Sequence, residues 1–131
     1  MIDYRIDAPL AIADILRVLD ASGIQRPTAD PARIGRMFAA ADIVVSAWHG
    51  EGLVGLCRAL TDFSYCCYLS DLAVDQAFQR RGIGGGLVEQ LRAELGDEVS
   101  IVLLSAPAAM GYYPALGFAP AANAFVLKRA R

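Results

Sequence analysis

The hydrophobic positions of this chain change their period several times, and each period predicts a helix or a strand. Alternation over residues 2–6 predicts a first strand. Two stretches with helical spacing follow, and their apolar positions are Ile12, Ile15, Leu16 and Leu19, then Ile34, Met37, Phe38 and Ala41. We expect the first helix to end at Gly23 and the second to begin at Asp30-Pro31, an N-cap followed by proline.

The middle of the chain is strand-like. Residues 43–48 and 53–60 flank the turn His49-Gly50-Glu51-Gly52, which predicts a hairpin. Residues 63–74 predict a longer strand that pairs with the strand before it through the turn Thr61-Asp62.

A glycine-rich turn separates this strand from a third helix, whose apolar face comprises Ile83, Leu87, Leu91 and Leu95 and which should end at Gly96. Residues 99–104 are a nearly continuous β-branched and leucine run, which predicts a strand buried on both faces. Residues 108–116 predict a short helix stopped by Gly117, and residues 125–128 predict a last strand. The order β-α-α-β-β-β-α-β-α-β over residues 1–131 predicts one α/β domain.

Composition narrows the class of protein. The 131 residues are 56% hydrophobic, so we expect an ordered core, and the formal net charge of −2 with no long basic run argues against a nucleic-acid partner. The charged, strand-like first residues do not suit a signal peptide, and no apolar run approaches a membrane span. Three cysteines in strand-like segments, Cys57, Cys66 and Cys67, predict reduced thiols in a cytoplasmic protein rather than disulfides or a zinc site.

The segment from Gln79 to Gly85 carries the first chemical signal. A strand that runs through a glycine turn into a helix leaves unpaired N–H groups at the helix N-terminus, which suit a phosphate or pyrophosphate. Gly82 and Gly84 would let the backbone approach such an anion closely. A Walker loop is excluded because Gly-Lys-Ser/Thr is missing, and a dinucleotide fingerprint is excluded because Leu87 stands at its third glycine.

What remains, Gln79-x-x-Gly82-x-Gly84, resembles the coenzyme loop of the GNAT superfamily of acetyl-coenzyme A-dependent N-acetyltransferases. Two further segments are similar to that superfamily in its order. Tyr68-Leu69-Ser70-Asp71-Leu72-Ala73-Val74 resembles its fourth strand, and Tyr112-Tyr113-Pro114-Ala115-Leu116-Gly117-Phe118 resembles the segment after its fifth strand. The resemblance covers about half the chain, residues 63–118.

The resemblance implies a central mixed, mostly antiparallel twisted sheet of about six strands flanked by about four helices. It implies acetyl-coenzyme A as cosubstrate, no metal, and transfer of the acetyl group to a primary amine by direct attack. The pantetheine arm would run along Leu72, Ala73 and Val74. The pyrophosphate would lie on the backbone of Gln79, Arg80, Arg81, Gly82, Ile83, Gly84 and Gly85. The side chains of Arg80 and Arg81 either add charge there or are solvated beside the turn.

Tyr113 matches the family tyrosine that protonates the coenzyme sulfur, and an ordinary phenol pKa of about 10 keeps it protonated at neutral pH. The alternative is that Tyr113 packs beside Pro114 and Phe118, as we expect of Tyr112. No general base can be assigned. On a regular strand Tyr68 and Ser70 share a face with Leu72, whereas Asp71 lies on the other. The candidates are Ser70, Asp71, Asp62, Glu51 and His49, or no base at all.

One position departs from the family pattern. Ala106 stands where the family often has an asparagine that contacts the coenzyme, so Ser105 replaces that contact or the contact is absent. The alternative function is therefore a coenzyme A-binding regulatory module with little or no turnover. The acceptor amine, a small molecule or a peptide, is not specified. A homodimer is expected because the apolar final strand should lie near a sheet edge, although a monomer shielded by Lys128, Arg129 and Arg131 is the alternative.

Overall fold

A five-stranded sheet forms the centre of the computed structural model, which describes all of residues 1–131. Its strands are β1 (Ile2–Ile6), β2 (Ile43–His49), β3 (Gly52–Thr61), β4 (Cys66–Val74) and β5 (Ser100–Val102). They lie side by side in chain order. The first four are antiparallel neighbours, whereas β5 runs parallel to β4. A parallel pair needs a crossover, and the third helix supplies it.

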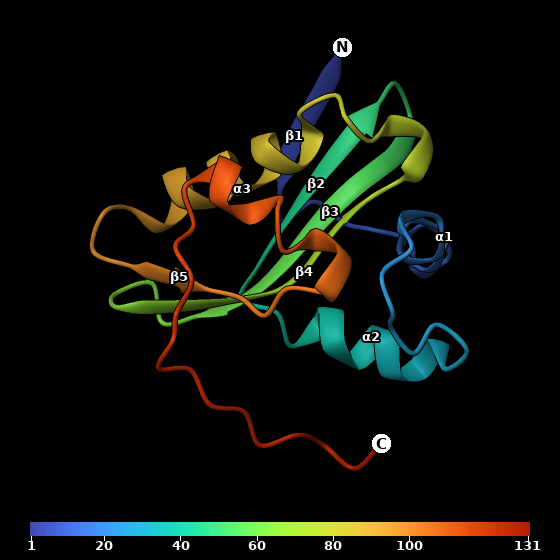
Figure 1. Ribbon diagram of the computed structural model, residues 1–131. Helices are drawn as coiled ribbons and strands as arrows, with labels where there is room; N and C mark the ends of the chain where they lie inside the picture. The colour runs from blue at the N-terminus through green and yellow to red at the C-terminus, as the bar shows by residue number, and fades with distance from the viewer.

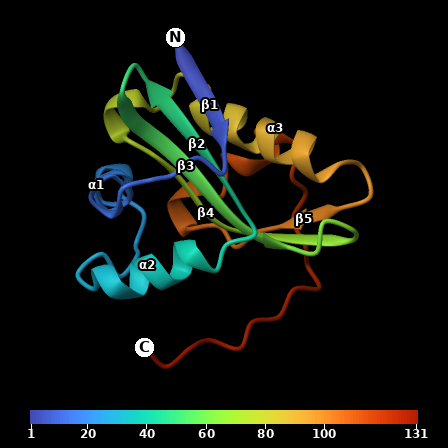
Figure 2. The ribbon, with the colours of Figure 1, turned by 180° about the vertical axis from the view of Figure 1, so that it is seen from behind.

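Three α-helices cover the two faces of this sheet: α1 (Ile12–Ser22), α2 (Pro31–Ala39) and α3 (Ile83–Leu95). Figures 1 and 2 show α3 on one face and α1 and α2 on the other. The predicted ends are confirmed. Gly23 ends α1 in the left-handed region with φ 84°. The Asp30 carboxylate accepts a hydrogen bond from the Arg33 N–H at the start of α2.

The core has two parts because the sheet is covered on both faces. Thirteen buried residues lie between the sheet and α3: Ile43, Val45, Ala47, Val54, Cys57, Ala59, Cys67, Leu69, Ile83, Leu87, Val88, Leu91 and Leu95. Eight lie between the sheet and the other two helices: Ile15, Val18, Leu19, Ile34, Trp48, Leu53, Leu56 and Ala73. No helix is both long and apolar enough to cross a bilayer.

A β-bulge interrupts β4 at Ser70. Arg58 of β3 lies opposite Asp71, but the next residue, Ala59, lies opposite Leu69, so Ser70 has no partner. The extra residue reverses the alternation of side chains. Leu69 and Leu72 therefore both contact the α3 core, and Asp71 lies on the α1–α2 face with Ala73. The expectation that Ser70 shares a face with Leu72 was wrong, because regular alternation does not continue through a bulge.

The strands β4 and β5 separate beside this bulge. Only Cys66, Cys67 and Tyr68 pair with β5. From Leu69 to Val74 the outer edge of β4 has no neighbouring strand, so its backbone polar groups on that side are free to pair with an extended ligand.

The fold class is confirmed, while three element predictions at the C-terminal side of the sheet were wrong in detail. Residues 63–65 belong to a turn because the Asp62 carboxylate accepts from the N–H groups of Ser64, Tyr65 and Cys66. The strand in 99–104 covers only Ser100–Val102, and it is not buried on both faces because Val102 is 49% exposed. Residues 108–116 form two 3₁₀ turns, Pro107–Ala109 and Tyr113–Leu116, instead of an α-helix.

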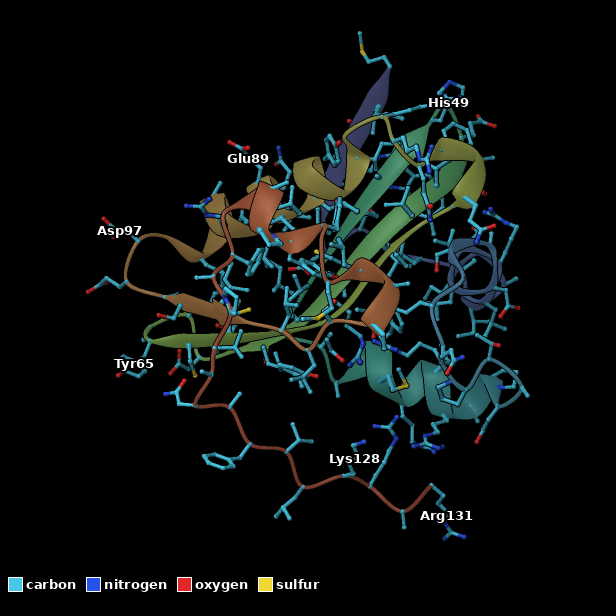
Figure 3. The ribbon with its side chains drawn as sticks, in the orientation of Figure 1. His49, Tyr65, Glu89, Asp97, Lys128 and Arg131 are labelled. Atoms are coloured by element: carbon cyan, nitrogen blue, oxygen red, sulfur yellow. The ribbon has the colours of Figure 1, made fainter.

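The predicted last strand does not form. Residues 125–128 belong to an extended tail without regular structure, and the sheet has five strands rather than six. The tail leaves the sheet and passes below α2 (Figure 1). The Arg131 carbonyl accepts a hydrogen bond from Arg33 of α2 at 3.1 Å, and Figure 3 shows Lys128 and Arg131 on this side.

Candidate functional site

The turn between β4 and α3 is held by its own side chains. The Asp75 carboxylate accepts from the Ala77 N–H at 2.9 Å and caps a 3₁₀ turn, Gln76–Phe78. The Gln79 amide donates to the Val74 carbonyl at 2.8 Å and to the Ser22 carbonyl at 3.4 Å. Gln79 therefore fixes the turn against the end of β4 and the end of α1.

The N-terminus of α3 is open to an anion. Gly82 caps the helix with φ 79°, and the first helical hydrogen bond joins the Gly86 N–H to the Gly82 carbonyl at 2.9 Å. The N–H groups of residues 83–85 precede that bond and have no helical acceptor. A methyl group placed on Gly82 would meet no atom within 4 Å. Free N–H groups at an open helix end fit a phosphate group.

The glycines inside α3 serve packing. A methyl group on Gly84 would overlap the Tyr112 hydroxyl, and one on Gly86 would overlap the Tyr4 hydroxyl. The space beside Gly84 is thus occupied by Tyr112. Close approach of α3 to these two tyrosines is a second physical reason for glycine at these positions.

The two arginines of the turn are exposed and differ in their contacts. Arg80 adopts φ 65°, which is uncommon for a residue other than glycine. The Arg81 guanidinium lies over the Phe78 ring, 5.1 Å from its centroid. Arg81 is therefore held beside the helix N-terminus, where its charge adds to the field of the free N–H groups.

Tyr113 is half-buried in the segment that follows β5. Its ring contacts Phe118 edge-to-face with centroids 5.7 Å apart and Tyr112 with centroids 5.3 Å apart. Burial raises the pKa of Tyr113 above 10, and the charge of Arg26 opposes that shift. The phenol is consequently neutral at pH 7, with a proton to donate.

A buried charged cluster lies beside the bulge of β4. Asp71 is fully buried, and its two oxygens accept from Arg26 Nε at 2.6 Å and from Arg58 Nε at 2.5 Å. Arg26 also donates to the Ser70 carbonyl, and Arg58 donates to the Ser70 hydroxyl at 2.8 Å. The cluster joins the loop after α1 to β3 and β4 at the point where β4 and β5 separate.

Comparison with known proteins identifies the family. Residues 40–120 match the family model described as "Acetyltransferase (GNAT) domain". The chain belongs to the GNAT family.

Several solved GNAT structures share the fold. A GNAT family acetyltransferase from Streptococcus pneumoniae has a TM-score of 0.78 and 20% identity, with all of both chains covered. One from Brucella melitensis, in complex with acetyl-CoA, has a TM-score of 0.72 and 22% identity over 92% of this chain and 84% of that one. The aminoglycoside N-acetyltransferase AAC(6')-Iy, in complex with CoA, has a TM-score of 0.74 and 15% identity over 100% of this chain and 96% of that one. No curated protein matches the sequence.

Two of the carboxylates considered as a base are engaged in hydrogen bonds, and the other two side chains with a basic group lie at the hairpin turn. Asp71 is paired with two guanidinium groups. Three backbone N–H donors, those of Ser64, Tyr65 and Cys66, hold the pKa of Asp62 below its ordinary value. Glu51 is exposed in the hairpin turn, and the exposed His49 packs its ring on Phe78 with centroids 5.3 Å apart. Figure 3 shows His49 at the end of the hairpin, away from the tail.

The sequence assigned no role to two functional candidates, namely Arg26 and Arg58. The signal for Arg58 was an isolated charge within the apolar strand 53–60, which requires a buried partner such as Asp71. The sequence around Arg26 does not predict its ion pair, because its partner Asp71 is 45 residues away.

Ala106 stands where the GNAT family often has an asparagine that contacts the coenzyme, and its side chain cannot form a hydrogen bond. The Ser105 hydroxyl donates to the Ala106 carbonyl at 2.8 Å, so its proton is used within the turn. No group of three or more His, Cys, Asp or Glu side chains is arranged to hold a metal ion.

Proposed function

We propose that this protein is an N-acetyltransferase that moves an acetyl group from acetyl-CoA to a primary amine by direct attack. The observation that carries the proposal is that two sets of unpaired backbone polar groups lie next to each other along the chain. The unpaired edge of β4 leads through a fixed turn to the free N–H groups at the N-terminus of α3. One surface suits an extended amide-containing arm, and the other suits the pyrophosphate at its end.

The coenzyme would be held mainly by backbone. Leu72 and Ala73 offer the pantetheine arm an open strand edge, while the Val74 carbonyl already accepts from Gln79. Ile83, Gly84 and Gly85 offer N–H groups to the pyrophosphate, with Arg81 beside them. The solved relatives from Brucella melitensis and AAC(6')-Iy hold acetyl-CoA and CoA, which supports the same coenzyme here.

The proposed reaction needs one proton donor from the protein. A neutral amine attacks the thioester carbonyl carbon, and a C–N bond forms. The C–S bond then breaks, the sulfur takes the proton of Tyr113, the amine loses a proton to water, and water returns a proton to the Tyr113 phenolate. Tyr113 is neutral at pH 7 at the ordinary phenol pKa of about 10, and burial raises that pKa further, so it holds a proton to donate. Since Asp71 is paired with two guanidinium groups and Asp62 accepts three backbone N–H groups, the amine is proposed to arrive neutral.

Thiol release tests the proposal directly. The intact protein incubated with acetyl-CoA and a panel of primary amines should release free CoA at a rate that depends on the amine. Calorimetry with CoA is run in parallel. Amine-dependent release supports the enzyme, whereas CoA binding without release for any amine would leave the regulatory module. Absence of CoA binding would overturn both.

We also propose a homodimer formed through the C-terminal tail. Phe125 and Leu127 are 96% and 102% exposed, an unfavourable state for large apolar side chains. The free edge of β5 borders a groove of about 800 Å³ between the end of α3 and residues 116–119. An apolar extended segment and an unpaired edge with an adjacent groove are complementary, and exchange between two copies would satisfy both.

The state of the cysteines supports the proposal that the protein is cytoplasmic. All three are free thiols, and Cys57 and Cys67 are buried. Burial raises the pKa of Cys57 to about 12 and that of Cys67 to about 11, so both are unreactive at neutral pH. Free cysteines of this kind support a reducing compartment such as the cytoplasm.

A further inference from the structure

The charged cluster at the bulge of β4 is not electrically balanced. Two guanidinium groups face one carboxylate, which leaves a net charge of +1, and no other carboxylate contacts either arginine. The chain as a whole has a net charge of −2, so this local excess is not a general surface property. A partly buried positive charge is stabilised when an anion approaches it.

The cluster also has hydrogen-bond donors to spare. A guanidinium has five N–H donors. Arg26 uses its donors on Asp71, the Gln25 carbonyl and the Ser70 carbonyl. Arg58 uses its donors on Asp71, the Ser70 hydroxyl and the Met37 carbonyl. About two N–H groups of each arginine are left without a protein acceptor.

Arg26 is the arginine that a ligand can reach. Its side chain is 25% exposed, while that of Arg58 is 8% exposed and that of Asp71 is fully buried. Arg58 and Asp71 therefore form the buried support that fixes the Arg26 guanidinium. The contact with Asp71 uses Nε, so the remaining donors lie on the terminal nitrogens.

Arg26 lies at the bulge of β4, beside the point where β4 and β5 separate. Its partner Ser70 is the bulge residue, two residues after Tyr68, which forms the last pair between β4 and β5. Its charge also acts on the phenol of Tyr113. Arg26 comes from the loop after α1, on the sheet face opposite α3, whose N-terminus is proposed to hold the pyrophosphate.

We propose that Arg26 binds a carboxylate of the acceptor, so that the substrate is an amino carboxylate whose amine lies at the thioester while its carboxylate pairs with Arg26. This inference rests on the proposed N-acetyltransferase function. A planar guanidinium matches a carboxylate with two parallel hydrogen bonds, which favours a carboxylate over a neutral polyol or a second cation. A polyamine without an anionic group would be repelled by the net charge of +1.

Acceptor pairs that differ only in charge test this inference. Glycine and the L-amino acids that carry a primary α-amine, together with β-alanine and 4-aminobutyrate, are each compared with the corresponding carboxamide in the thiol-release assay with saturating acetyl-CoA. The best amino acid should exceed its carboxamide by about 10- to 100-fold in kcat/KM, because a hydrogen-bonded charge is lost. No preference for the carboxylate in any pair would overturn the proposal.

Variants then separate binding from a merely structural role. Arg26→Gln should raise the KM of the carboxylate acceptor about 10-fold or more, with little change for the carboxamide or for acetyl-CoA. Arg26→Lys should recover part of that loss. Arg36→Gln is the matched control, since Arg36 is exposed on α2 and its side chain makes no hydrogen bond or ion pair. Equal losses for carboxylate and carboxamide would show that Arg26 only braces the loop.

A binding measurement keeps the inference testable if no amine is acetylated. Calorimetry of the CoA-loaded protein should then detect binding of amino acids but not of their carboxamides. The Arg26→Gln variant should not bind the amino acids. That result would support the carboxylate site while the proposed transferase function failed. No binding of any amino acid would overturn the site, even if CoA itself bound.

Discussion

At the scale of single residues, the charged side chains of β3 and β4 show how a sheet core accepts a charge. Asp71 loses its hydration completely, and two guanidinium groups replace it. Such a cluster contributes little net stability by itself, but removal of one member leaves an uncompensated buried charge. Its structural effect is to hold the loop after α1 against the bulge of β4.

The catalytic prediction also belongs to this scale. Tyr113→Phe removes the hydroxyl and keeps the edge-to-face contact with Phe118. If the phenol protonates the leaving thiolate, kcat should fall by about 10²- to 10⁴-fold with little change in CoA affinity. Because burial raises the pKa of Tyr113, its acid form persists through neutral pH, and the Tyr113-dependent part of kcat should decline only above about pH 10. Steady-state kinetics across pH measures both effects.

Tyr112→Phe provides the control for that experiment. Tyr112 adjoins Tyr113, and its hydroxyl lies against Gly84 of α3, where it packs. We expect Tyr112→Phe to keep kcat near that of the original protein. A near-normal kcat in Tyr113→Phe would return Tyr113 to a packing role, the alternative that the sequence left open.

Residue-level chemistry was only partly predictable from the sequence. The order of motifs brought attention to Tyr113 and to the turn from Gln79 to Gly85, because local spacing encodes a strand, a turn and a helix. Arg26 and Asp71 were not connected, because the ion pair spans 45 residues and depends on a bulge. Alternation alone cannot locate a bulge, since it comes from pairing between strands.

At the scale of elements, α3 is built for close approach at its N-terminal end. Its first turns contain Gly84, Gly85 and Gly86, although glycine weakens a helix by about 0.5–1 kcal/mol relative to alanine. The Tyr112 and Tyr4 hydroxyls occupy the space that side chains would take at the first and last of these glycines. This packing places the free N–H groups of α3 beside the end of β4.

Gly84→Ala tests this account of the helix. The added methyl group would overlap the Tyr112 hydroxyl, so we expect a loss of about 1–3 kcal/mol in the free energy of unfolding. Tyr112→Phe in the same chain should restore most of that loss, because the next atom of the ring, Cζ, is 3.2 Å from the new methyl group. Chemical denaturation with urea measures all three variants.

Gly85→Ala is the matched control for the helix. Its methyl group would meet only the flexible end of Leu116 at 3.2 Å, and alanine favours the helix, so stability should change little. If Gly84→Ala is as stable as Gly85→Ala, packing against Tyr112 does not explain why residue 84 is glycine. Close approach of a phosphate would then be the better explanation.

Element boundaries were predictable wherever a local rule sets them. Gly23, Asp30-Pro31 and Gly96 end or begin helices through their own backbone or side chains, and the structure confirms all three. The strand in residues 99–104 was overestimated because its apolar composition indicated burial on both faces, which would need a further covering strand that the described chain does not form. For the helix in 108–116, Gly117 marked the right end, but the residues before it form 3₁₀ turns.

At the scale of the whole molecule, the sheet has two edge strands, β1 and β5. The edge strand β5 pairs through three residues only, and Val102 and Leu104 are 49% and 52% exposed. Figures 1 and 2 show the tail that leaves this region and runs past α2 without joining the sheet. Long unpaired edges and apolar tails are usually covered in a stable protein.

The last prediction is that this edge is covered by the tail of a second copy. Light scattering across a concentration series should give a mass near twice the 14.0 kDa of one chain. The double variant Phe125→Glu/Leu127→Glu should shift the mass toward one chain, because it removes the two exposed apolar side chains of the tail and burial of the two new charges would have a large desolvation cost. Ala121→Glu/Ala122→Glu places the same charges earlier in the tail and should leave the dimer intact. A mass near 14.0 kDa at every concentration would exclude the dimer, and a dimer that persists in Phe125→Glu/Leu127→Glu would place the interface on another surface.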